Sequence, residues 1–332
     1  MATHHGNMLS RGLDRMVLLI GPLGTFGAIV FVFARIGDLA MLAPRALLGK
    51  YLPKSEDFGA IDPVLSLLTL LFIPASILCF AATKAISRLS ARKEQQQCAA
   101  LIQDFSLLVF AGGIVTALLV LLLSPFLLSR LHLEAYQEWV PLFLAAWIAI
   151  GLLLQVFCAI FQGLQRYVLL SMLGALSPIF LAILTLVFVV YLNTGLAGAF
   201  LTRLASGLIV MILALWFLRD FTTRSRASYR EEWPTIRQAL MPATLLVVCT
   251  TLLIAFERLF VRNFLFEESG GLAAIITLGQ IPMWLLTHLA TGLLPLASAE
   301  HATGSDISKR LTHAVAIGSF VTLCCAVFFA LV

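Results

Sequence analysis

Charged residues are scarce in this sequence, at 12% of its 332 residues, and the scarcity restricts the class of protein. A soluble domain has about 25% charged and about 45–50% apolar residues, whereas 61% of this chain is hydrophobic. These proportions exclude a water-soluble globule. Apolar stretches long enough to cross a bilayer, at about 20 residues each, recur between Met16 and Val332 and indicate a polytopic membrane protein.

Cysteine is also sparse, and the spacing of the six cysteines excludes a metal framework. The sequence contains no CxxC pair and no Cys/His cluster, which are the usual signatures of zinc sites. Most of the cysteines lie inside apolar runs, where they act as small, lipid-compatible hydrophobic residues. We therefore expect neither a metal ion nor a cofactor.

The 22 lysines and arginines outnumber the 17 acidic residues, but their positions do not favour nucleic-acid binding. Most lie between apolar spans, and no basic face is interleaved with aromatic residues. Fourteen fall on one side of the predicted membrane and three on the other. Because cytoplasmic loops retain positive charge, we expect a cytoplasmic N-terminus, membrane lipids as partners and no nucleic-acid partner.

The apolar stretches divide into nine predicted membrane-spanning helices. They cover residues 27–48, 63–84, 104–128, 140–161, 167–192, 196–218, 239–264, 272–295 and 311–332. We expect four parts in the chain. These are a cytoplasmic or interfacial N-terminus (1–26), a first lobe of six helices (27–218), a cytoplasmic linker (219–238) and a partial second lobe of helices seven to nine (239–332).

A weak internal repeat relates the two lobes. Residues 45–52 (RALLGKYL) align with residues 258–265 (RLFVRNFL) at an offset of 213, and an acidic, serine-containing turn follows each copy. Six spans separate the copies, and an even number gives both the same orientation, so the lobes are predicted to be parallel repeats. Because the second repeat stops inside an apolar run, we expect about three further helices in the full-length protein.

Five segments in chain order resemble motifs of the polysaccharide (O-antigen type) flippases. They are residues 47–59 (LLGKYLPKSEDFG), 161–167 (FQGLQRY), 195–198 (GLAG), 256–262 (FERLFVR) and 294–310, which contains LPLAS and DISKR. In that family the corresponding motifs follow helix one, join helices four and five, enter helix six, lie in helix seven and follow helix eight. The resemblance extends over nearly the whole chain, although Glu257 stands where aspartate is commoner and Asp38 is additional.

The resemblance implies an all-α polytopic membrane protein with the MATE-like fold of the multidrug/oligosaccharidyl-lipid/polysaccharide exporter superfamily. Two lobes surround a central cavity in this fold, and the second lobe is incomplete in this sequence. It implies a transporter, not an enzyme, that flips a polyprenyl-pyrophosphate-linked oligosaccharide across the bacterial cytoplasmic (inner) membrane. A polysaccharide polymerase and glycosyltransferases are the protein partners that the resemblance implies.

Arginines inside the predicted spans are the candidate substrate-binding residues. There are five of them, Arg35, Arg45, Arg203, Arg258 and Arg262. A bare pyrophosphate in hydrocarbon costs on the order of tens of kcal/mol, so its passage needs a water-filled cavity with fixed positive charge. Arginine suits this role because its planar group binds phosphate oxygens in pairs and keeps its charge.

Two acidic residues share these spans, Asp38 and Glu257, and they are candidates for ion coupling or for charge pairs. Arg35 and Asp38 are three residues apart on a helix, where they can neutralise each other. Glu257 can pair with Arg262 or with a residue of another helix. Arg45 and Arg262 lie near span ends, where arginine can also snorkel to headgroups, so both interpretations remain open at this stage.

Three other functions compete with the polysaccharide flippase. A cation or drug antiporter of the same superfamily would exchange protons at an acidic residue such as Asp38. A lipid II flippase would also line its cavity with arginines. A glycosyltransferase or polymerase needs acid/base carboxylates on a sizeable external loop, whereas the largest predicted external loop covers only residues 129–139.

Overall fold

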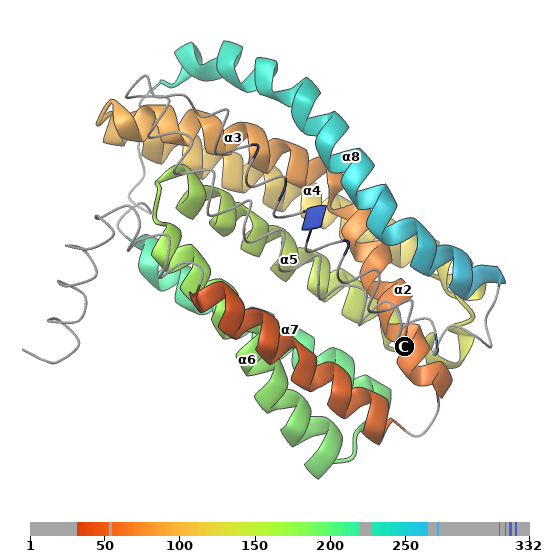
Figure 1. The fold of residues 1–332 in the computed structure, drawn as a ribbon. Helices are drawn as coiled ribbons and strands as arrows, with labels where there is room; N and C mark the ends of the chain where they lie inside the picture. The colour runs from red at the N-terminus through yellow and green to blue at the C-terminus, as the bar shows by residue number, and fades with distance from the viewer. Residues whose placement is uncertain are drawn as a thin grey trace, which may run out of the picture.

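The computed structural model describes residues 32–52, 55–219 and 228–264, together with residues 271, 312, 316, 319, 320 and 323. These described residues are nearly all helical, and they contain no strand. Long helices lie side by side along most of their length (Figure 1). The all-α fold predicted from the sequence is therefore confirmed.

The helices follow the order of the predicted spans. A helical segment at 32–51 comes first, and after it come α2 (Ser55–Leu71), α3 (Ile73–Ala91), α4 (Gln95–Arg130), η1 (Glu134–Tyr136), α5 (Val140–Gly163), α6 (Tyr167–Thr185), the π-helix η2 (Leu186–Tyr191), α7 (Gly195–Leu218), η4 (Arg230–Glu232) and α8 (Trp233–Phe264). The predicted spans 272–295 and 311–332 fall almost entirely outside the described residues, as does the N-terminus at 1–26.

Several helices extend beyond the predicted spans. The α4 helix begins nine residues before position 104, and α8 begins at Trp233, inside the segment predicted as a linker. Hydrophobicity locates the part of a helix that contacts lipid, and a helix can continue past it into the headgroup region or water. The polar ends of these helices are therefore missed by an apolar window.

The helices are suited to a lipid environment. Among the described residues, α4, α5, α6 with η2, and α7 are long and apolar enough to cross a bilayer, and the bent pair α2 and α3 qualifies as a fifth span. Large hydrophobic side chains on α4 are widely exposed, including Leu107, Leu118, Leu122 and Phe126. A helix that is apolar on its outer face as well as its inner one is typical of a membrane span.

A sharp bend separates α2 from α3. The two helices meet at Phe72 with an angle of 53°, and Pro74 occupies the first turn of α3. Proline lacks the N–H that would continue the hydrogen-bond ladder of the preceding helix. The Phe72 ring packs over Gly151 of α5, where an added Cβ would lie 2.5 Å from the ring. Glycine at this position allows the close approach of the bend to α5.

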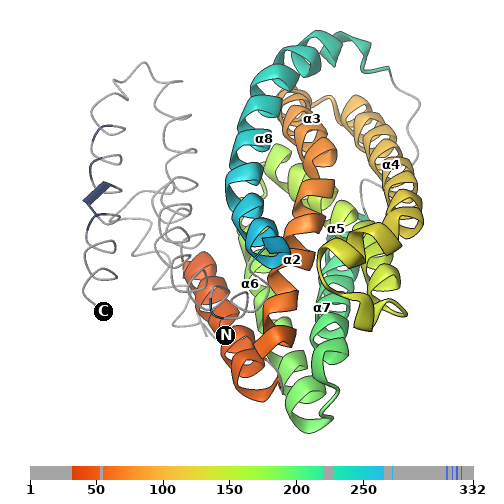
Figure 2. The ribbon, with the colours of Figure 1, turned by 90° about the vertical axis from the view of Figure 1, so that its right-hand side faces the viewer.

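The α5 helix lies in the middle of the described bundle, where it contacts α3, α4 and α7. The α8 helix runs along α2 and α3, and the two views show this packing over most of its length (Figure 1, Figure 2). The segment 32–51 approaches α6 closely at Gly37, where an added Cβ would be 3.2 Å from the Ala175 backbone. Helices before and after the predicted linker are thus in direct contact.

Candidate functional site

The first component of the candidate site is an ion pair between two buried side chains. Arg45 Nη2 lies 3.6 Å from Asp62 Oδ1, and each side chain exposes only about a tenth of its surface. Arg45 comes from the segment 32–51 and Asp62 from the second turn of α2. The pair therefore joins two helical segments that follow each other in the chain.

Two further arginines lie near this pair. Arg203, on α7, interacts electrostatically with Asp62 and with Arg45. Arg258, on α8, is near enough to Arg45 to repel it. The structure therefore brings three of the five predicted arginines together, from three separate helical segments. We define Arg45, Asp62, Arg203 and Arg258 as the arginine cluster.

The arginine cluster carries more positive than negative charge. It holds three guanidinium groups and one carboxylate, and all four side chains are at least half-buried. Like charges repel strongly in a medium of low dielectric constant, so one carboxylate does not balance three arginines. A site of this composition attracts an anion better than a cation.

Arg35 and Asp38 lie apart from this cluster and form a pair of their own. Arg35 Nη2 is 3.1 Å from Asp38 Oδ2, the three-residue helical contact considered from the sequence. Glu257 and Arg262 belong to α8, but their side chains lie outside the described part of the structure. Substrate binding by Arg35 and Arg262, and ion coupling by Asp38 and Glu257, therefore stay predictions.

A second ionic cluster lies toward the other end of α8. The Glu232 carboxylate, just before α8, is 3.6 Å from Arg88 Nε of α3 and 3.5 Å from Nη1 of Arg92, the residue after the last of α3. Nearby, the Tyr229 hydroxyl donates a hydrogen bond of 2.8 Å to Asp104 Oδ2 of α4. We call Glu232, Arg88, Arg92, Tyr229 and Asp104 the linker clamp, because they attach the start of α8 to α3 and α4.

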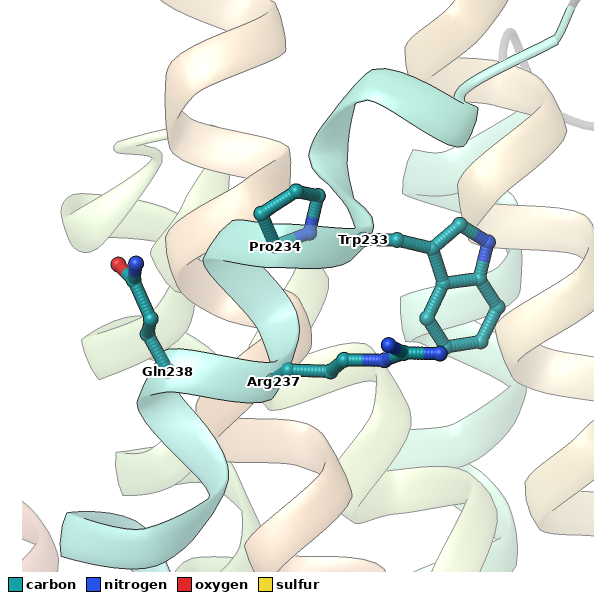
Figure 3. Close-up of a pocket in the computed structure, with 4 residues that line it drawn as sticks. All are labelled: Trp233, Pro234, Arg237 and Gln238. Carbon is teal, nitrogen blue, oxygen red and sulfur yellow. The ribbon is translucent and has the colours of Figure 1, made fainter.

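A surface pocket of about 630 Å³ opens beside the start of α8, lined by Trp233, Pro234, Arg237 and Gln238. Trp233 and Arg237 project to the same side of the helix, and Gln238 projects to the other (Figure 3). The pocket is separated from Arg258 by at least 20 residues of α8, which is about 30 Å along the helix at about 1.5 Å per residue. It is therefore not part of the arginine cluster.

Other polar side chains in the spans have local roles. The Ser76 hydroxyl donates a hydrogen bond of 3.2 Å to Gln155 Oε1, which joins α3 to α5. This bond gives Gln155 a role in joining the two helices. No group of three or more His, Cys, Asp or Glu side chains suited to a metal ion occurs among the residues that the structure describes.

Asp62 of the arginine cluster and Glu232 of the linker clamp were not among the candidate residues predicted from the sequence. Asp62 lies one residue before the span predicted at 63–84, whereas in the structure it lies inside α2. Glu232 was assigned to a polar linker. In both cases the available signal was an acidic residue near the start of an apolar run, and its partners lie on other helical segments.

No family model matches the sequence, and no curated protein sequence matches it either. Its fold is similar to those of solved transporters. An inward-facing multidrug resistance MATE family transporter of the MOP superfamily is 17% identical, with a TM-score of 0.61 over 90% of this chain and 69% of that one. A MATE protein in the straight conformation is 16% identical, with a TM-score of 0.69 over 94% and 74% of the two chains.

A third similar structure is a MOP superfamily transporter from Pyrococcus furiosus, whose binding pocket is described as having reverse polarity that suggests a different function. It is 14% identical, with a TM-score of 0.54 over 91% of this chain and 75% of that one. At these identities the likeness is one of fold. The chain therefore has an all-α, MATE-like polytopic fold, as the sequence predicted.

Proposed function

We propose that this protein translocates a polyprenyl-pyrophosphate-linked oligosaccharide across a membrane by alternating access. The observation that carries the proposal is the proximity of Arg203 and Arg258 to the ion pair of Arg45 with Asp62. The fold similarity to transporters supports a transport role over an enzymatic one. The sequence resemblance to polysaccharide flippases supports this substrate class.

The charge of the arginine cluster suits a diphosphate. Two linked phosphates carry several negative charges and many oxygen acceptors, and guanidinium groups bind such oxygens in pairs. Three arginines from different helices would surround the diphosphate while the polyprenyl tail stays in lipid. The net positive charge offsets the loss of water that the diphosphate suffers on entering the protein.

A cation or drug antiporter is the second candidate, and two observations favour it. Solved structures of similar fold include multidrug resistance transporters, and Asp62 is a buried carboxylate of the kind that exchanges protons for cations. The surplus of arginines around Asp62 disfavours a cationic substrate. A lipid II flippase is a further alternative, because its substrate also carries a pyrophosphate.

Reconstituted transport distinguishes these candidates. The purified protein in liposomes is given a fluorescent polyprenyl-pyrophosphate oligosaccharide, lipid II or a cationic dye under a proton gradient. We expect translocation of the oligosaccharide, and loss of translocation in Arg258→Ala without loss of protein from the membrane. Dye exchange with no oligosaccharide translocation would reverse the ranking.

The cellular setting follows from the same proposal. The predicted orientation puts the N-terminus and the linker clamp on the cytoplasmic side of a bacterial inner membrane, where lipid-linked sugars are assembled. Glycosyltransferases that build the oligosaccharide would act before this protein, and a polysaccharide polymerase would act after it. Genes for both next to the gene of this protein would support the proposal.

A further inference from the structure

Asp62 is a buried carboxylate to which the proposed function gives no role. It exposes 7% of its surface, in the second turn of α2. Its Oδ1 faces Arg45 at 3.6 Å, and Arg203 attracts it from α7. An anionic group of the protein itself therefore lies among the arginines that are proposed to bind an anionic substrate.

The contact between Asp62 and Arg45 is longer than a charge-assisted hydrogen bond, in which nitrogen and oxygen are about 2.7–2.9 Å apart. Burying a carboxylate carries a desolvation penalty, and a long contact offsets only part of it. A ligand oxygen that approaches the same guanidinium group more closely is therefore favoured over the carboxylate.

Asp57 provides a comparison within the same helix. It is also 7% exposed, and it accepts a hydrogen bond from the Tyr136 hydroxyl, which joins α2 to η1. Among the described residues, none donates a hydrogen bond to Asp62. Its ion-pair partner there is Arg45. Asp57 is thus fixed in place by a neighbouring side chain, whereas Asp62 is held by charge.

We propose that Asp62 is an internal substitute for the substrate's phosphate, whose carboxylate pairs with Arg45 in the empty site and is displaced from it when a diphosphate binds. The inference rests on the proposed function, because it requires a phosphate-bearing ligand. Asp62 stabilises the empty cluster by neutralising one arginine. It also weakens ligand binding by competition, which favours release after translocation.

Equilibrium binding to the purified protein in lipid nanodiscs tests this proposal. The probe is a fluorescent polyprenyl pyrophosphate, and the competitors are inorganic pyrophosphate and phosphatidylglycerol. Asp62→Asn removes the competing charge and is expected to tighten binding about tenfold, equivalent to about 1.4 kcal/mol. Unchanged or weaker binding in Asp62→Asn overturns the proposal.

The matched control is Asp57→Asn, which neutralises an equally buried carboxylate of the same helix whose hydrogen-bond partner is Tyr136 and not an arginine of the cluster. It is expected to lower the Tm and to leave binding unchanged, and a similar tightening in this variant overturns the proposal. Inorganic pyrophosphate is expected to displace the probe. Displacement by phosphatidylglycerol and not by pyrophosphate would identify a phospholipid site and overturn the proposal.

The failure of the proposed function has a different signature. If the proposed function is wrong, neither the wild-type protein nor Asp62→Asn binds the polyprenyl pyrophosphate. If the wild-type protein binds it and Asp62→Asn binds it no more tightly, the inference about Asp62 is overturned and the proposed function is not. If repulsion among the arginines prevents Asp62→Asn from folding, the comparison is made in an Arg203→Gln background. Adding Asp62→Asn to that background is expected to tighten binding, and an unchanged affinity overturns the proposal.

Discussion

Glu232 lies 3.5 Å from Arg92 across the junction between α8 and α3, and Arg88 lies 3.6 Å from the same carboxylate. The two sides of this contact are buried to very different extents. Glu232 is 1% exposed, whereas the side chains of Arg88 and Arg92 are 43% and 46% exposed. The arginines therefore retain access to water, and the carboxylate does not.

This difference in exposure predicts that mutations on the two sides of the contact lower the unfolding free energy by different amounts. The double variant Arg88→Gln/Arg92→Gln leaves a buried carboxylate without its counter-charges, and we expect a loss of about 3–5 kcal/mol in unfolding free energy. Glu232→Gln leaves two partly hydrated arginines, and we expect a loss of about 1 kcal/mol or less. Denaturant unfolding in detergent measures the unfolding free energy of both variants. The control is Lys84→Gln, which removes an exposed cation from α3. A larger loss in Glu232→Gln contradicts the prediction.

The bend at Phe72 predicts intolerance of a larger residue at Gly151. A Cβ at Gly151 would lie 2.5 Å from the Phe72 ring, and overpacking of this kind costs about 1–3 kcal/mol. Gly151→Ala should therefore lower the Tm, and adding Phe72→Leu should restore much of it. Gly112→Ala is the matched control, because a Cβ at Gly112 meets nothing within 4 Å. Equal effects at the two glycines would disprove the packing explanation.

The hydrogen bond between Tyr136 and Asp57 predicts a stability loss in Tyr136→Phe. Asp57 is 7% exposed, so the variant leaves a buried carboxylate without its donor, which costs about 1–3 kcal/mol. The edge-to-face contact of the ring with Trp139 is retained, so the change isolates the hydroxyl. Unfolding measurements should show no comparable loss for Tyr191→Phe, in which the altered side chain is 76% exposed.

The ionisation of Tyr229, in the linker clamp, predicts that the stability of the folded protein falls at alkaline pH. Burial, then the hydrogen bond to Asp104 and the charge of that carboxylate, raise the pKa of Tyr229 from 10.0 to about 12. The neutral phenol is favoured in the folded protein, so its contribution to stability is complete below pH 10 and is lost as the pH rises to about 12.

Difference absorbance of tyrosinate, obtained by subtracting the titration of Tyr229→Phe, measures this ionisation directly. Asp104→Asn removes the charge but keeps an amide oxygen that can accept the hydrogen bond, so the pKa of Tyr229 should fall part of the way toward its ordinary value. An ionisation near pH 10 in the wild-type protein would show that Tyr229 is neither buried nor in contact with Asp104 in solution.

The helices could be predicted because their apolar windows are long. Arg45 and Arg258, which lie near each other in the structure, occupy equivalent positions in the internal repeat. Asp62 and Glu232 could not be assigned in the same way. Their ion-pair partners, Arg45 for Asp62 and Arg88 and Arg92 for Glu232, lie on other helical segments. Which side chains of two helices meet depends on how the helices are rotated when they pack, and hydrophobic periodicity does not determine this rotation. The bend at Phe72 had a sequence signal in Pro74, but its angle depends on the space that Gly151 leaves on α5.

The α8 helix connects the arginine cluster to the linker clamp through a single continuous backbone. Glu232 precedes Arg258 by 26 positions, which corresponds to about 39 Å of helix. A tilt of about 5° around the Arg258 end would displace Glu232 by about 3 Å, by the same geometry. Since the ion pairs of Glu232 are 3.5 and 3.6 Å long, a displacement of this size is enough to separate Glu232 from both arginines.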